Sequence, residues 1–262
     1  APRSTLSPYS TIFGYLTANA DPGWTFAGWS GDASGTGTTT SVIMNGDRTV
    51  TATFTQDQYT LTINIEGNGT ATRTPNTPTY VYGEVVDLLA LPDVGWSFEL
   101  WSGYIFGYDP DASITMDEDK TVTLTFSRNQ YSLTVNTEGN GTVTRDPDHL
   151  LFFHGETVDL EAIADPGWTF DSWSGDAMGT TTPATITMDG DKTVTATFTQ
   201  EQYTLTINVV GSGTTTYTPV QATYVYGDLV QLGASPAIGW TFTSWTGDIN
   251  ETFPNAEITM DG

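Results

Sequence analysis

Residues 167–176 read Gly-Trp-Thr-Phe-Asp-Ser-Trp-Ser-Gly-Asp, and this stretch decides the fold because versions of it recur at a fixed distance along the chain. All eight tryptophans fall into two series with a step of 72 residues, and one phenylalanine series follows the same step. The three series are Trp24, Trp96, Trp168 and Trp240; Trp29, Trp101, Trp173 and Trp245; and Phe26, Phe98, Phe170 and Phe242. A constant period of this length is typical of tandem repeats.

The repeat boundaries follow from the tyrosine that opens each period. They divide the chain into residues 1–58, a partial repeat with a divergent N-terminal segment, two complete repeats at 59–130 and 131–202, and residues 203–262, a repeat that lacks its last strand. Four residues, 55–58, separate the last expected strand of one repeat from the first strand of the next, and they span at most about 14 Å. Neighbouring repeats must therefore nearly touch, which predicts an extended, semi-rigid rod.

Within a repeat the apolar residues alternate with polar ones. Residues 59–65 read Tyr-Thr-Leu-Thr-Ile-Asn-Ile, and the turn Gly-Asn-Gly at 67–69 supplies the backbone freedom that a hairpin needs. No stretch of ten residues has helical spacing. The sequence predicts an all-β fold, a tandem array of small β-sheet repeat domains with five or six short strands each. The tryptophans and phenylalanines of the three series are the predicted core, because a repeat of this size without disulfides needs large buried side chains.

The overall charge excludes some classes of partner. The chain of 262 residues has a formal net charge of −24, with 31 acidic and 7 basic residues, and it has no cysteine. Such a charge repels phosphate backbones and anionic lipid headgroups, so we expect no nucleic-acid partner. No apolar run approaches the roughly 20 residues of a bilayer span, so we expect no membrane insertion in this segment. Disulfides and thiolate metal sites are impossible without cysteine.

Residues 167–176, together with Ile-Thr-Met-Asp-Gly-Asp-Lys-Thr-Val-Thr-Ala-Thr-Phe at 186–198, resemble the divergent internalin-type B repeat, also called the Listeria–Bacteroides repeat. The resemblance covers residues 16–262. It implies a β-grasp-like or other small β-sheet fold, and a place on secreted or surface-anchored proteins of bacteria and archaea, as stalks or adhesive modules. It offers no catalytic residues to carry over. The second repeat departs from the pattern, because Tyr104 stands where the other repeats have Asp32, Asp176 and Asp248.

Two acidic turns are candidate metal sites. Closely spaced carboxylate oxygens, which calcium prefers, come from Asp117, Asp119, Asp189 and Asp191, with Asp109 and Asp111 as weaker additions. An ordinary hairpin turn explains the same residues without a metal. The sequence therefore predicts no cofactor, with weakly bound calcium as an open alternative. Nucleophile elbows, phosphate-cradling loops and His-Glu-x-x-His motifs are missing, and an acid/base pair would not be copied every 72 residues, so the sequence predicts no enzyme.

Two features of the sequence suggest attachment or binding of sugars. The N-glycosylation pattern Asn-x-Thr occurs at Asn68, Asn140 and Asn250, and the first two of these also suit hairpin turns. The paired aromatic residues around each Trp-x-Phe could also form a sugar-stacking platform, although aromatic residues two apart in a strand are more often core residues.

The two ends of the array lead to the functional hypothesis. The last repeat stops before the segment that reads Lys-Thr-Val-Thr-Ala-Thr-Phe at 192–198 in the preceding repeat, and the first repeat begins without its opening hairpin. Either the sequence is a window of a longer array, or a strand of a neighbouring copy completes each open end, with Ser4 to Phe13 as the candidate donor. We therefore predict a non-enzymatic structural protein of an extracellular surface fibre that self-associates. The alternative is a cell-surface adhesin or stalk module that binds glycans through loop or aromatic residues.

Overall fold

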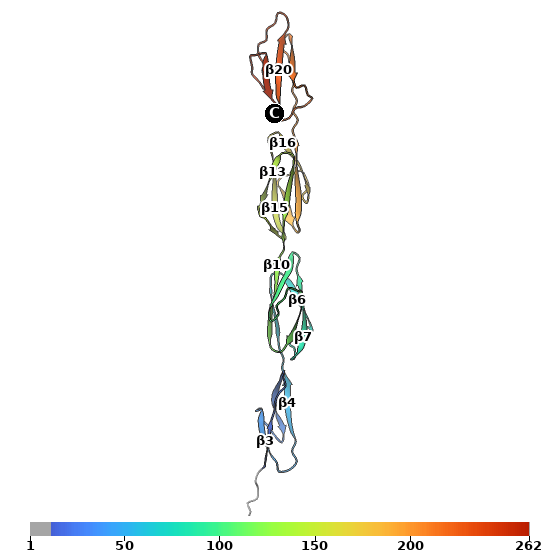
Figure 1. Ribbon diagram of the computed structural model, residues 1–262, viewed down its shortest axis with the longest axis vertical. Coiled ribbons are helices and arrows are strands. Elements are labelled where there is room, and N and C mark those ends of the chain that lie inside the picture. Colours follow the sequence, from blue (N-terminus) through green and yellow to red (C-terminus); the bar gives the residue numbers. More distant parts are fainter. Residues whose placement is uncertain (1–11, 262) are drawn as a thin grey trace, which may run out of the picture. The chain divides into compact units, whose positions relative to one another are not determined.

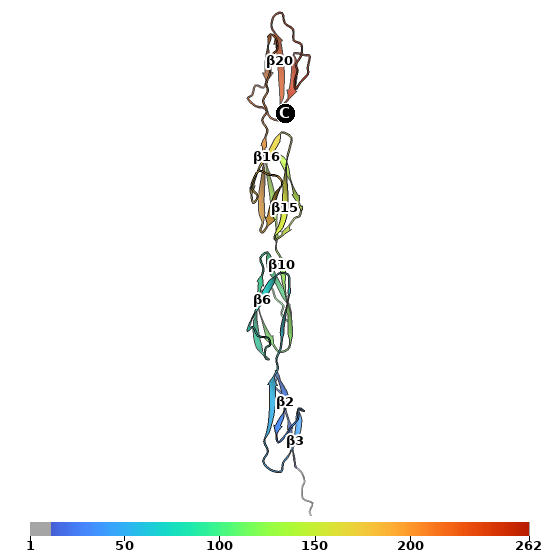
Figure 2. The same ribbon diagram turned by 180° about the vertical axis from the view of Figure 1, so that it is seen from behind.

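The computed structural model describes residues 12–261, and the chain divides into two units, residues 1–128 and 129–262. Each described element is a β-strand, and neither view shows a helix among residues 12–261 (Figures 1 and 2). The predicted all-β class is confirmed. Residues 12–261 contain no helix that is long and apolar enough to cross a membrane.

The first unit holds the first two repeats. The strands of the first repeat are β1 (Phe13–Thr17), β2 (Trp24–Gly31), β3 (Thr39–Ile43) and β4 (Val50–Gln56). Those of the second repeat are β5 (Leu61–Glu66), β6 (Gly69–Thr74), β7 (Glu84–Pro92), β8 (Trp96–Gly103), β9 (Asp111–Met116) and β10 (Lys120–Arg128).

The second unit holds the last two repeats. The third repeat contains β11 (Gln130–Tyr131), β12 (Leu133–Glu138), β13 (Gly141–Asp146), β14 (Phe152–Phe153), β15 (Glu156–Ala164), β16 (Trp168–Gly175), β17 (Ala184–Met188) and β18 (Lys192–Gln200). The fourth contains β19 (Gly213–Thr218), β20 (Leu229–Pro236) and β21 (Asn255–Thr259). Figure 2 labels β15 and β16 of the third repeat from behind.

Each complete repeat contains two three-stranded sheets, and the third repeat also has a two-stranded sheet of β11 and β14. In the second repeat the orders are β5-β10-β8 and β6-β7-β9, and in the third repeat they are β12-β18-β16 and β13-β15-β17. The last strand of the repeat is therefore the centre of its sheet. It runs parallel to the first strand, with Lys120 opposite Leu61, and antiparallel to β8, with Leu124 opposite Trp101.

The core of a complete repeat lies between its two sheets. The closing strand supplies Val122, Leu124 and Phe126 in the second repeat and Val194, Ala196 and Phe198 in the third, and all six are buried. Their partners come from the opposite sheet, for example Val86 and Leu88 of β7. Threonines alternate with these residues along the closing strand, so the period of two places one apolar face inward.

The first and fourth repeats are less complete. Among residues 12–261, β4 pairs with β2 alone, and its other edge, which pairs with a parallel strand in the second and third repeats, has no strand beside it. In the fourth repeat residues 205–210 and 240–247, which correspond to β12 and β16, form no strand. The buried core of this repeat is accordingly small and consists of Tyr224, Val230, Leu232 and Met260.

Inside each unit a glycine of one repeat lies against a tyrosine of the next. A Cβ added at Gly23 would lie 2.1 Å from Cβ of Tyr82, and one added at Gly167 would lie 2.1 Å from Cβ of Tyr226. Both glycines have φ in the left-handed region, +78° and +76°. Their carbonyls accept hydrogen bonds at 2.8 Å from the linker amides of Asp57 and Glu201. The linker and the tyrosine therefore meet at one glycine in both units.

The burial of the tryptophans differs between repeats. Trp101 is 0% exposed and Trp173 is 3% exposed, whereas Trp24 and Trp240 are 42% and 56% exposed. The prediction that all eight indoles lie in a core is wrong at these last two positions. In the complete repeats the corresponding rings, Trp96 and Trp168, both flank a closing strand that has neighbours on each side and lie over a hairpin glycine. Within residues 12–261 the first repeat has no such hairpin and the fourth has no closing strand.

Candidate functional site

The acidic turns join the strand before them to the closing strand. In the second repeat Oδ1 of Asp119 accepts hydrogen bonds from the amide of Thr60 at 2.7 Å and from its hydroxyl at 2.9 Å. In the third, Oδ1 of Asp191 accepts from the amide of Ser132 at 2.8 Å and from its hydroxyl at 2.9 Å. The backbone hydrogen bond, followed by the hydroxyl, lowers the pKa of each carboxyl. Each carboxylate thus holds the start of the repeat to the start of its closing strand.

The other two calcium candidates are bound by lysines. Asp117 lies 2.7 Å from Nζ of Lys120, and Asp189 lies 2.6 Å from Nζ of Lys192. These hydrogen bonds lower the pKa of both carboxyls and raise the pKa of Lys192. No group of three or more potential metal-ligating side chains occurs among residues 12–261. The turns have a structural explanation, and calcium binding stays a prediction.

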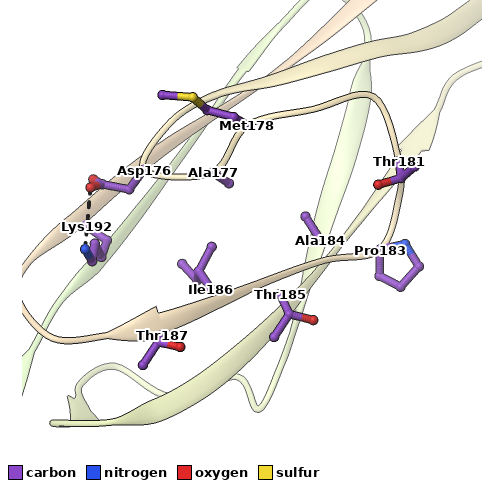
Figure 3. Close-up of a pocket in the computed structure, with 10 residues that line it drawn as sticks. All are labelled: Asp176, Ala177, Met178, Thr181, Pro183, Ala184, Thr185, Ile186, Thr187 and Lys192. Carbon is purple, nitrogen blue, oxygen red and sulfur yellow. Dashed lines mark ion pairs between the residues drawn. The ribbon is translucent and has the colours of Figure 1, made fainter.

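A hollow of about 450 Å³ opens beside this turn in the third repeat, between the loop after β16 and strand β17 (Figure 3). Asp176 and Lys192 lie at one end, with the carboxylate 3.7 Å from Nζ. Asp176 also accepts a 2.7 Å hydrogen bond from the amide of Thr193. Met178 lies on the rim and is 85% exposed. The charged groups in the hollow thus bind each other and the backbone of the same repeat.

The same position explains the departure of the second repeat from the pattern. In the first repeat Asp32 pairs with Arg48 at 2.7 Å and accepts from the amide of Thr49, so it repeats the arrangement of Asp176. In the second repeat the ring of Tyr104 takes the place of the carboxylate, and Nζ of Lys120 lies 5.5 Å from its centroid. A cation–π contact therefore replaces an ion pair, and the basic partner is kept.

After Tyr104 the second repeat carries two further aromatic residues that the repeat pattern does not predict. Residues 104–108 read Tyr-Ile-Phe-Gly-Tyr, where the other repeats read Asp-Ala-Ser-Gly-Thr, Asp-Ala-Met-Gly-Thr and Asp-Ile-Asn-Glu-Thr. Tyr104 is 53% exposed, and Phe106 and Tyr108 are each 71% exposed. We call this set of three rings the aromatic loop. The signal in the sequence was the departure from the repeat itself, which replaces small and polar residues with aromatic ones.

The second tryptophan series supports this loop from beneath. The amide of Trp101 donates to the carbonyl of Gly107 at 2.9 Å, and its indole Nε1 donates to the carbonyl of Pro110 at 3.3 Å. The indole of Trp29 makes a corresponding bond to the carbonyl of Gly37 at 2.9 Å and is half-buried. These indoles have a structural role and are not a flat, open sugar platform.

The predicted glycosylation positions are accessible. Asn68, Asn140 and Asn250 are all exposed. The first two lie in the hairpin turns before β6 and β13, where their carbonyls accept hydrogen bonds from Asp93 and Asp165. Their side chains face no packed core, and glycosylation stays a prediction.

Comparison with known protein families adds a match along most of the chain. The divergent InlB B-repeat domain matches residues 10–58, 59–130, 131–202 and 203–262. The chain belongs to the divergent InlB B-repeat family. The resemblance inferred from residues 167–198 is therefore confirmed, and the InlB B-repeat is present four times in tandem.

Comparisons with solved structures and with curated proteins say less about this chain. A solved structure titled "The Bacillus anthracis TIE protein" is similar at a TM-score of 0.42 and 8% identity, over 97% of this chain and 67% of that one. Comparison with curated proteins gives no match. InlB B-repeat families are typical of non-enzymatic, surface-associated proteins that serve as structural or adhesin-like modules.

Proposed function

We propose that this InlB B-repeat chain is a non-enzymatic structural protein of an extracellular surface fibre, in which the tandem repeats bear mechanical load and set the distance between the ends of the chain. The family supports a surface role. The acidic side chains of the turns and of the hollow support a structural role, because their partners are lysines, backbone amides and hydroxyls of the same repeat. A net charge of −24 keeps such chains soluble and separate from one another along their sides.

The contact between neighbouring repeats is the observation that carries this proposal. In both units the linker amide bonds to the carbonyl of a left-handed glycine, and the tyrosine of the next repeat covers the α-carbon of that glycine. No side chain fits between the two. Repeats that touch in this way transmit force from one to the next, as a fibre requires, whereas adhesive domains on flexible linkers need no such contact.

We further propose that copies join end to end by strand insertion. Residues 205–210 and 240–247 of the fourth repeat correspond to the two strands that pair with β10 and β18 in the second and third repeats, and these two segments form no strand. The slot of this proposal is the closing-strand position between them. A strand supplied by a neighbouring copy would run parallel to 205–210 and antiparallel to 240–247 and would bury three apolar side chains. Most of the candidate donor, Ser4 to Phe13, lies outside the described residues, and its last residue, Phe13 of β1, pairs with Ile43 of β3.

A peptide experiment tests the slot. A labelled peptide of residues 191–200 is added to the full chain, and hydrogen exchange of residues 205–210 and 240–247 is followed by mass spectrometry. We expect the peptide to slow exchange in both segments, and a control peptide with V194D and F198D to leave them unchanged. Equal exchange with both peptides would refute strand insertion.

A second peptide, of residues 4–13, tests the donor separately. Protection of the same two segments by this peptide supports donation by the N-terminal segment. Protection by residues 191–200 alone would show that the slot takes a closing strand and that residues 4–13 are not its donor.

An adhesin is the second candidate function, and one observation favours it. The aromatic loop of the second repeat exposes three large rings, and the corresponding loops of the other repeats carry none at these positions. Surface aromatic residues that gather in one loop are typical of binding sites rather than of stalks.

A further inference from the structure

Phe106 and Tyr108 of the aromatic loop are exposed, and the fold of the repeat does not require their rings. The amide of Trp29 donates to the carbonyl of Gly35 at 2.9 Å, and that of Trp173 donates to Gly179 at 2.7 Å. These bonds match the one from Trp101 to Gly107 at 2.9 Å in the second repeat. The loops of the first and third repeats therefore have the same anchor without any aromatic side chain. The aromatic residues of the second repeat need another reason.

The loop is also held in place before any partner arrives. Gly107 donates back to the carbonyl of Trp101 at 3.2 Å, and the carbonyl of Pro110 accepts from the amide of Ala90 on β7 at 3.0 Å. Lys120 lies over the ring of Tyr104. Because the backbone on both sides of Phe106 is bonded to strands, a ligand that contacts its ring orders little additional chain, which favours affinity.

The rings form a corner rather than a flat platform. The centroids of Phe106 and Tyr108 are 5.5 Å apart, and their planes meet at 81°. One ring can serve as a floor and the other as a wall. The carboxylates of Asp109 and Asp111 follow directly along the chain and are exposed, and Oδ1 of Asp109 accepts a 3.1 Å hydrogen bond from the amide of Asp111. The corner is thus formed by two aromatic faces, and two exposed carboxylates follow it in the sequence.

We propose that the aromatic loop of the second repeat is a binding site for a neutral oligosaccharide. A pyranose ring has an apolar C–H face that packs on an aromatic face, and its hydroxyls would donate to the tyrosine oxygen or to the carboxylates that follow along the same loop. The charge of the protein decides between classes of glycan. A chain with a net charge of −24 repels sulfated, sialylated or uronic-acid polymers, so an uncharged sugar fits best. This proposal rests on the adhesin candidate named above, and it is independent of strand insertion because the site lies in a complete repeat.

The matched variant comes from the protein itself. The first repeat carries serine and threonine at the positions of Phe106 and Tyr108, namely Ser34 and Thr36. The double substitution F106S/Y108T therefore gives the second repeat a loop sequence with which this fold is already built. Phe253, which is 70% exposed in the fourth repeat, provides a control variant, F253S, that removes one exposed ring elsewhere.

The experiment uses the full chain on an array of neutral, sulfated and sialylated oligosaccharides, followed by titration of the best neutral one in solution. We expect binding to neutral glycans that falls about tenfold or more in F106S/Y108T and stays unchanged in F253S, since each ring contributes roughly threefold to tenfold. Circular dichroism of F106S/Y108T checks that the repeat still folds.

Three outcomes would overturn the proposal. The first is no binding of the wild-type chain to any neutral glycan on the array. The second is neutral glycan binding that F106S/Y108T leaves intact. The third is a wild-type chain that self-associates in sedimentation through these rings and loses that association in F106S/Y108T, which would make a second copy the occupant of the corner.

Discussion

Replacing Trp101 with alanine is expected to destabilise the second repeat by about 3–5 kcal/mol, the range for a large aromatic side chain removed from a packed core. Trp101 is 0% exposed, and its ring packs among the buried residues of both sheets. Its indole N–H also donates to the carbonyl of Pro110, so the substitution removes a hydrogen bond as well as packing. The residue opposite Leu124 on the neighbouring strand keeps its backbone pairing but loses its large side chain.

Hydrogen exchange followed by mass spectrometry measures this effect locally, which matters because repeats of an array can open separately. A loss of 3–5 kcal/mol corresponds to exchange faster by roughly 10² to 10⁴-fold in the most protected amides of β7 and β10. The matched control is Trp240→Ala, because Trp240 is 56% exposed in the fourth repeat. We expect that control to change exchange by less than about tenfold. Equal effects of the two substitutions, or no effect of the first, would refute the two-sheet core described above.

Three further predictions concern the junction, the acidic turns and the cation–π contact. Gly167→Ala is expected to separate the third and fourth repeats, which is measured as faster hydrogen exchange at their contact. The control Gly239→Ala is not expected to do so, because Gly239 has a similar φ of +80° but open space around it. Equal effects of the two substitutions would show that backbone strain alone is responsible. The lowered pKa of Asp191 contributes stability that is present above the pKa of this residue in the unfolded chain and is lost as pH falls through its pKa in the folded chain. Acid unfolding of D191N should therefore depend less on pH below about 5 than that of the wild type. Parallel unfolding curves of the two proteins would contradict this role of Asp191. Tyr104→Asp should restore the ion pair of the other repeats and leave thermal unfolding of the second repeat nearly unchanged, and a large fall in its melting temperature would contradict the interchange.

Much of the fold can be predicted from the 72-residue period of the sequence. A step of 72 residues that is kept by every tryptophan indicates one domain repeated, and the alternation along residues 59–65 and 192–198 predicts strands with one buried face. These features are local or strictly periodic, which is why a single sequence reveals them. The pairing of strands is not local. That the closing strand lies parallel to the first one, about 59 residues earlier in the chain, depends on contacts such as Asp119 with Thr60 that no spacing rule encodes.

The candidate sites show the same limit. Periodicity predicts equal burial for equivalent residues, yet Trp24 and Trp240 are exposed because burial also requires the neighbouring hairpin or strand to be present. The acidic turns suggested calcium because the sequence shows closely spaced carboxylates but does not show the lysines and backbone amides that bind these carboxylates in the folded repeat. In the aromatic loop the sequence shows Tyr104 as a departure from the pattern, but Phe106 and Tyr108 belong to no repeated series, and their exposure depends on the folded loop.

End-to-end assembly is the central claim, and electron microscopy of the purified chain tests it most directly. Negative-stain images are recorded at rising protein concentration, with and without an excess of the peptide of residues 191–200. The account expects fibres that lengthen with concentration and that the peptide shortens or abolishes by occupying the slot in the fourth repeat. Separate single particles at every concentration, or fibres that the peptide leaves unchanged, would contradict it.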